Sequence, residues 1–321
     1  MNSTATPPGS GKPTRAIERP HPLLSVMAWE LRRIRASRLF WLQALGFFCF
    51  LLFVMWALHA PENFAGGVSN GGSSESLSGF IAGTSAWGLL RTLPIALLLL
   101  VLLLPFIMAD GVTRDLQRRT HELLMTTALP TWAYVWGRYL IGLLMSLGLA
   151  LLLLAALLGI GGLLHLTITD YPLPQTGAVL LLWVGMVVPA TVLVSSLSFA
   201  LGTVLPRLTT LAKIVILVAW IVGAVMLPTV FSQTTPPAWY VNWDPTSAVT
   251  ALGILPQYTG SFSGPQAGMS EAALQQILLR SENMMPDIAG WFASHLLLAG
   301  FSLLLVLVAA LAFKRTRDTL S

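Results

Sequence analysis

The sequence predicts an all-α integral membrane protein with six transmembrane helices, and three observations carry that prediction. Hydrophobic residues make up 55% of the 321 residues and charged residues only 10%, whereas soluble domains hold about 25% charged residues. Six apolar segments are each long enough to cross a bilayer. Lys and Arg gather in every second polar segment instead of spreading evenly along the chain. Such a chain needs lipid as its solvent.

Each apolar segment is expected to be a helix, because an open strand in lipid would leave backbone N–H and C=O groups unpaired. A helix needs about 20 apolar residues to cross about 30 Å of hydrocarbon. The third and fourth segments exceed that length, so we expect them to tilt or to extend beyond the bilayer. The predicted spans are 39–58, 86–109, 137–164, 176–204, 214–231 and 289–313.

The positive charges predict the orientation. If the six spans alternate in direction, 16 of the 18 Lys and Arg residues fall on one side, and only Arg91 and Arg280 fall elsewhere. The positive-inside rule then places both termini and the loops 110–136 and 205–213 in the cytosol. We therefore expect a multi-pass protein of a bacterial plasma (inner) membrane.

The two ends of the chain differ from the membrane part at 22–313. Residues 1–21 are rich in Pro, Ser, Thr and Gly and are expected to be a disordered cytosolic tail, and 314–321 a second cytosolic tail. Between tail and first span, 22–38 carries an apolar stripe at helical spacing with arginines off it. This pattern favours an interfacial helix on the membrane surface. The alternative is a plain stop signal before the first span.

The segments expected outside differ in kind. Segment 59–85 is rich in Gly and Ser, without Lys or Arg, and is typical of a flexible linker. Segment 232–288 holds an aromatic cluster, a turn or helix start at Asp244, and an apolar run over 246–255. Ser270 to Arg280 has the pattern of a capped amphipathic helix. We expect short helices in the outer leaflet here, with a loose loop as the alternative.

A polar stretch between the second and third spans carries most of the functional information. Residues 114–127 can form a short helix that ends before Pro130 and displays charges of both signs. Such a helix is typical of a docking element, although an ordinary solvated loop has the same pattern.

Motifs for chemistry within the chain fail on inspection. His121-Glu122 begins a zinc-protease signature, but Met125 stands where the second histidine belongs. The serines near 196 and His295 lack the Gly-x-Ser-x-Gly frame of a nucleophile. Charges inside the spans are almost absent, which disfavours an ion-coupled carrier. We predict neither catalysis nor a metal site, and the single Cys49 allows no disulfide within the chain.

The ordered motifs of the chain resemble the permease subunit of type-2 ATP-binding-cassette (ABC) transporters, over roughly 22–313. They are Trp29-Glu-Leu-Arg-Arg33, Thr120-His-Glu-Leu-Leu124 with the proline at 130, Gly137-Arg138 where the family has Gly-Lys, and Trp243-Asp-Pro-Thr-Ser247. The chain departs from the family pattern at Arg119, where a glycine is usual, at His121, at the inserted Ala128-Leu129, and at Asp244, where Asn is usual. The outer segment 232–288 is also longer than usual.

The resemblance implies a half-transporter that exports a hydrophobic or amphipathic substrate. A separate cytosolic ATPase would bind ATP and Mg²⁺, so no cofactor is expected in this chain, and a second permease copy or paralogue would complete the pathway. Spans two and five would line the central seam. The coupling helix that docks on the ATPase would use Arg114, Arg118, Arg119, Thr120, Glu122 and Leu124, and the elbow helix Trp29, Glu30, Arg32 and Arg33.

Two other functions remain open from sequence. A non-transporting membrane scaffold or assembly protein would present the same spans, and a secondary carrier, less favoured, would run without an ATPase.

Overall fold

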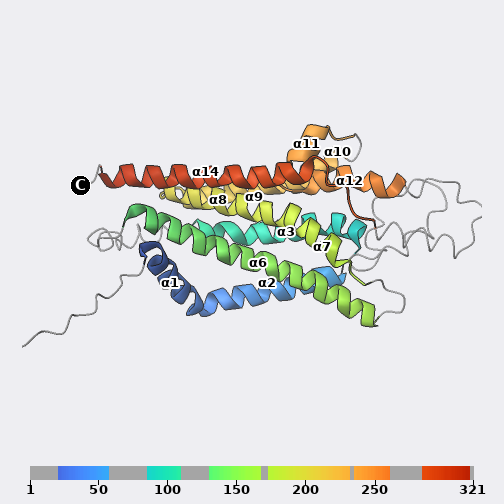
Figure 1. The fold of residues 1–321 in the computed structure, drawn as a ribbon, viewed down its shortest axis with the longest axis horizontal. Helices are drawn as coiled ribbons and strands as arrows, with labels where there is room; N and C mark the ends of the chain where they lie inside the picture. The colour runs from blue at the N-terminus through green and yellow to red at the C-terminus, as the bar shows by residue number, and fades with distance from the viewer. Residues whose placement is uncertain are drawn as a thin grey trace, which may run out of the picture.

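A computed structural model describes residues 21–57, 85–109, 130–167, 173–231, 235–260 and 284–318. All regular structure in these residues is helical. Figure 1 shows long helices running side by side, with the C-terminus and α1 toward one end and α12 toward the other. The elements are α1 (Pro22–Arg35), α2 (Arg38–Ala57), α3 (Ala86–Met108), α6 (Thr131–Thr167), α7 (Thr176–Leu182), η4 (Trp183–Val187), α8 (Val188–Val204), α9 (Thr209–Ile221), η5 (Val222–Met226), α10 (Leu227–Phe231), α11 (Ala238–Trp243), α12 (Ala248–Gly260) and α14 (Trp291–Asp318).

Six helical stretches in the described residues are long and apolar enough to cross a membrane, which confirms the predicted spans. The fourth stretch joins α7, η4 and α8, and the fifth joins α9, η5 and α10. The third begins at Thr131, six residues before the expected start at 137. Pro130 explains this start, because its carbonyl accepts from the N–H groups of Ala133 and Tyr134 and so opens the first turn.

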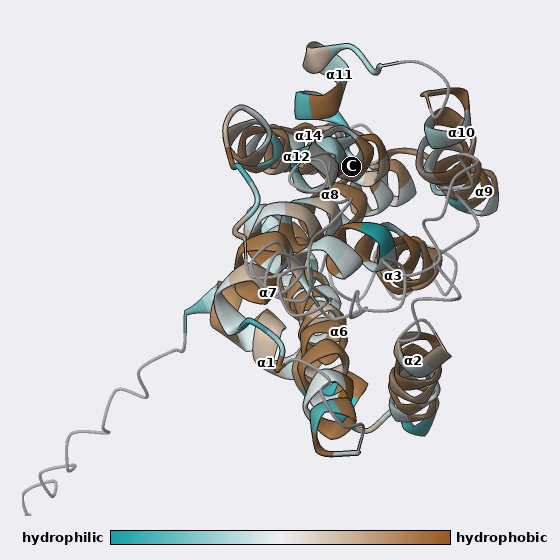
Figure 2. Ribbon diagram, turned by 90° about the vertical axis from the view of Figure 1, so that its right-hand side faces the viewer, coloured by the Kyte–Doolittle hydropathy of each residue, from teal (hydrophilic) through white to brown (hydrophobic). Residues whose placement is uncertain are grey.

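The core lies around α3 and α8. Within an 18-residue apolar part of each span, half of the residues in α3 and 56% of those in α7–α8 are buried, against 17% in α9–α10. Seen end-on in Figure 2, α8 lies between α14 and α3, and brown apolar residues cover the outer helices as well as the core. A bundle whose outer faces are apolar needs lipid around it.

Two π-helical turns interrupt the fourth and fifth spans. Each turn ends two residues before a proline, Pro189 after η4 and Pro228 after η5. A proline has no N–H to donate to the carbonyl four residues earlier, so the regular α-helical ladder breaks at Gly185 and Ala224. The same spacing of a π turn and a proline at both positions shows that the two interruptions have one cause.

Helix α12 spans 248–260 and so confirms a helix where 246–255 is apolar, but extends further. Its Tyr258 ring stacks on Trp87 of α3 with centroids 6.4 Å apart, and its hydroxyl donates to the Met284 carbonyl at 3.0 Å. Burial raises the pKa of Tyr258, since the phenolate would lose its hydration. These contacts tie the short outer helix to the bundle.

Candidate functional site

The described part of the chain brings ionisable groups together where α1 packs against the start of α6. Glu30 of α1 and Arg138 of α6 are both buried, at 6% and 5% exposure. Arg138 Nη2 lies 2.8 Å from Glu30 Oε1. This is a buried ion pair between segments more than one hundred residues apart. It links α1 to α6 electrostatically.

Gly137 makes this approach possible. A Cβ at Gly137 would lie 2.8 Å from Val26 Cγ1, too close for a side chain. Val26 and Glu30 are the buried residues of α1, one helical turn apart, so they form its contact face. The two residues of the Gly137-Arg138 motif therefore have different roles. Gly137 leaves space for α1 to approach, and Arg138 forms the ion pair with Glu30 of α1.

Aromatic rings complete the surroundings of Arg138. Its guanidinium carbon lies 5.0 Å from the ring centroid of Tyr134 and 5.6 Å from that of Trp29. Such cation–π contacts are stronger where water is excluded. A planar guanidinium can stack on two rings while it pairs with a carboxylate, which an ammonium group cannot do.

The four predicted elbow residues differ in their exposure. Glu30 is buried, whereas Trp29 is half exposed and Arg32 points outward and is exposed. Arg33 lies between these extremes, with its Nη1 3.5 Å from Glu30 Oε1. The structure has a helix at Pro22–Arg35 within the expected 22–38, and its role as an elbow on the membrane surface stays a prediction. Its buried face is not the apolar stripe, because Leu24 is 59% exposed.

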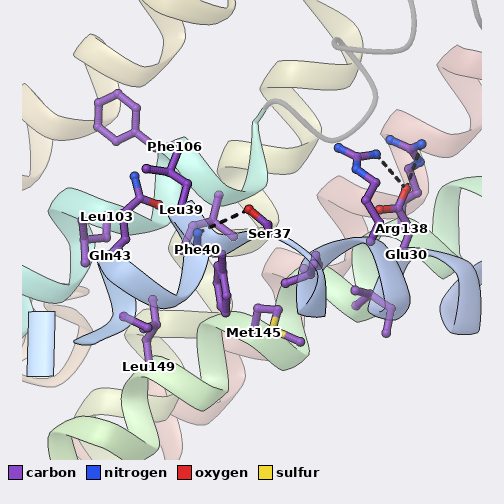
Figure 3. Close-up of a pocket in the computed structure, with 16 residues that line it drawn as sticks. Glu30, Ser37, Leu39, Phe40, Gln43, Leu103, Phe106, Arg138, Met145 and Leu149 are labelled. Carbon is purple, nitrogen blue, oxygen red and sulfur yellow. Dashed lines mark hydrogen bonds and ion pairs between the residues drawn. The ribbon is translucent and has the colours of Figure 1, made fainter. Parts of the chain in front are cut away.

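A groove of about 520 Å³ runs from this ion pair along α2, α3 and α6. Figure 3 shows Glu30 and Arg138 at one end, and Leu103, Gln43 and Phe106 toward the other. Sequence reasoning did not find this groove, because its walls come from four helices that are distant in the chain.

A second polar cluster lies at the opposite end, between α11 and α12. Asp244 is completely buried. Its Oδ1 accepts from the Thr246 amide and hydroxyl at 3.0 and 2.8 Å, and its Oδ2 from the amides of Val249 and Thr250 at 2.7 and 3.3 Å. This carboxylate, with four hydrogen-bond donors, caps the start of α12, so its role is structural. The sequence predicted a turn or helix start here, and this is confirmed.

The histidine and serines tested as a protease site take other partners. His295 Nδ1 lies 3.0 Å from the Gly185 carbonyl at η4, and its Nε2 3.4 Å from Thr250 Oγ1. Ser196 instead meets the Tyr139 hydroxyl at 2.8 Å and accepts from Ser302 at 3.2 Å. The two groups serve packing between α8, α6 and α14.

The expected coupling helix at 114–127, with Arg114, Arg118, Arg119, Thr120, Glu122 and Leu124, lies outside the described residues, as does the expected helix at 270–281. The structure describes the helices on either side of 114–127. α3 ends at Met108 and α6 begins at Thr131, two helical turns before Arg138 of the ion pair.

One comparison with known proteins gives a match. A family model described as "ABC-2 family transporter protein" matches residues 68–311, about three quarters of the chain, including five of the six membrane-length stretches. A search of curated proteins found no matching protein.

Proposed function

The chain belongs to the ABC-2 family of transporter proteins, and on this premise we propose that it forms half of the membrane pathway of an ATP-driven exporter. The observation that carries the proposal is the family match over 68–311 together with six membrane-length helices. In this proposal a separate ATPase subunit binds ATP and Mg²⁺, and a second permease copy or paralogue completes the pathway. The substrate is hydrophobic or amphipathic.

We propose that segment 114–127 docks on the ATPase and passes its motion to the bundle through α6. The connection supports this route. The segment leads within a few residues into α6, and α6 is fastened to α1 by a buried ion pair. A rigid start of α6 would turn a push on the segment into movement of a helix 37 residues long.

The docking proposal is tested by reversing one charge. A charge pair loses about 2–5 kcal/mol when one partner is truncated in a desolvated interface, and reversal adds repulsion. Glu122→Arg is therefore expected to insert normally but to lose copurification of the ATPase and stimulation of its hydrolysis, by more than Glu122→Ala does. Glu62→Arg, a reversal in the segment expected outside, serves as the control. Wild-type copurification and coupled hydrolysis with Glu122→Arg would contradict the docking role.

The same purification separates the alternatives. A permease brings down an ATPase, a scaffold or assembly protein brings down other partners, and a secondary carrier runs alone. Export itself is tested with the purified complex in vesicles, where ATP supplied on the ATPase side should drive substrate away from that side.

A further inference from the structure

The groove between α1, α2, α3 and α6 combines an apolar wall with a charged end. Its volume of about 520 Å³ lies within the roughly 300–1,000 Å³ of small-ligand sites. The wall is formed by apolar side chains, namely Leu39, Phe40, Leu103, Phe106, Ile107 and Met145. Leu39 and Phe106 are 64% and 55% exposed, so the groove is open on the outer surface of the bundle. A ligand that enters there must itself be apolar along most of its length.

The charged end carries a net positive charge. Glu30, Arg33 and Arg138 line it, one carboxylate against two guanidinium groups. Glu30 Oε1 is 2.8 Å from Arg138 and 3.5 Å from Arg33, so its negative charge is already shared between two cations. The side chain of Arg33 is 35% exposed and keeps donors for a further anion.

The depth of this end suits a lipid headgroup. Arg33 lies in the last turn of α1, just before α2 starts at Arg38, and Arg138 lies in the third turn of α6. These are the ends of the helices at which the Lys and Arg residues gather. Basic pockets between transmembrane helices on the cytosolic side are suited to anionic headgroups.

We propose that this groove binds one anionic phospholipid of the surrounding bilayer, with its phosphate at Arg33 and an acyl chain along Phe106 and Met145. The site goes beyond the proposed export function, since it holds whether or not this lipid is transported. A zwitterionic ethanolamine lipid fits less well, because its ammonium group would have to compete with two arginines for Glu30.

The test is native mass spectrometry of the full chain in detergent, titrated with dioleoyl-phosphatidylglycerol or dioleoyl-phosphatidylcholine. The expected result is one tightly retained phosphatidylglycerol that phosphatidylcholine does not displace. A charge-assisted hydrogen bond contributes about 1.5–3 kcal/mol, so Arg33→Gln should weaken retention at least about tenfold. Arg35→Gln makes the same charge change on the same helix at an exposed side chain outside the groove, and should retain the lipid.

A second pair of variants tests the apolar wall. Met145→Trp should fill the groove and reduce retention, whereas Leu144→Trp, at a 51% exposed neighbour outside the groove, should not. Glycerol 3-phosphate without acyl chains should not compete. Equal retention of both lipids, preference for phosphatidylcholine, or unchanged retention in Arg33→Gln and Met145→Trp would overturn the proposal. No ATPase is present in this assay, so it can fail while the export function stands.

Discussion

At the scale of single residues, Glu30 and Arg138 each compensate the cost of burying the other. A buried charge without a partner is strongly unfavourable, so truncating one member of such a pair costs about 3–5 kcal/mol. The pair fastens α1, which otherwise touches the bundle along a short face around Val26. The ion pair therefore fixes the position of α1 against α6.

Glu30→Ala is expected to lower the free energy of unfolding by about 3–5 kcal/mol, because Arg138 would stay buried and lose its carboxylate. Arg138→Ala should cost less, because Glu30 would keep Arg33 at 3.5 Å, and the double variant should cost less than the sum of the two. The measurement is a double-mutant cycle of unfolding in mixed micelles. Arg32→Ala, at an exposed side chain, should change the free energy by about 0.5 kcal/mol or less. Additive losses in the double variant would contradict an energetic coupling between Glu30 and Arg138.

Asp244→Asn is expected to destabilise the outer helices, although Asn is the residue that the family resemblance suggests here. An amide has one oxygen, so the donors that now meet Oδ2 would face an NH₂ group. Leaving a buried donor unsatisfied costs about 1–3 kcal/mol. Thermal unfolding in detergent measures the loss, with Asp287→Asn as the control at an exposed residue whose carboxylate accepts the Ala289 amide. An unchanged Tm would show that the cap tolerates an amide.

At the scale of helices, the spans could be predicted from the sequence and their partners could not. Each span carries its own signal, about 20 apolar residues without charges, so its existence needs no knowledge of its neighbours. The pairing of Glu30 with Arg138 depends on how two helices that are distant in the sequence meet. The sequence motifs included both residues but did not predict that they contact each other. The π turns were missed because apolar length is unchanged by one extra residue in a turn.

Gly202 of α8 lies close against the backbone of Ala109, the residue that follows α3. A Cβ there would fall on the Ala109 carbonyl oxygen and lie 2.9 Å from Ala109 Cα, and backbone atoms cannot move aside. Gly202→Ala is therefore expected to cost about 1–3 kcal/mol through overpacking. Gly148→Ala, with no neighbour within 4 Å, should be neutral or stabilising, because alanine favours helix by about 1 kcal/mol. Unfolding in mixed micelles compares them, and equal effects would mean that α8 can shift away from α3.

At the scale of the whole molecule, the two ends of the bundle differ in chemistry. One end holds Arg138, Arg33 and Lys213, whose ammonium group lies 5.1 Å from the Phe106 ring centroid. The other end holds α11 and α12 (Figure 1), and Asp244 between them caps the start of α12. Such a polarity supports one orientation in the membrane, with the basic end in the cytosol.

That orientation is the last prediction, and it is tested by labelling single cysteines with a membrane-impermeant maleimide. Cys49 is exposed on a span, so Cys49→Ala provides the background. Glu75→Cys and Gln266→Cys should react in intact cells, whereas Ser321→Cys should react only after the membrane is permeabilised. The reason is the charge distribution, because carrying the basic loops across would oppose the bias that sets topology. Labelling of positions 75 and 266 only after permeabilisation would show the opposite orientation. The groove between α1, α2, α3 and α6 would then face the outer side of the membrane.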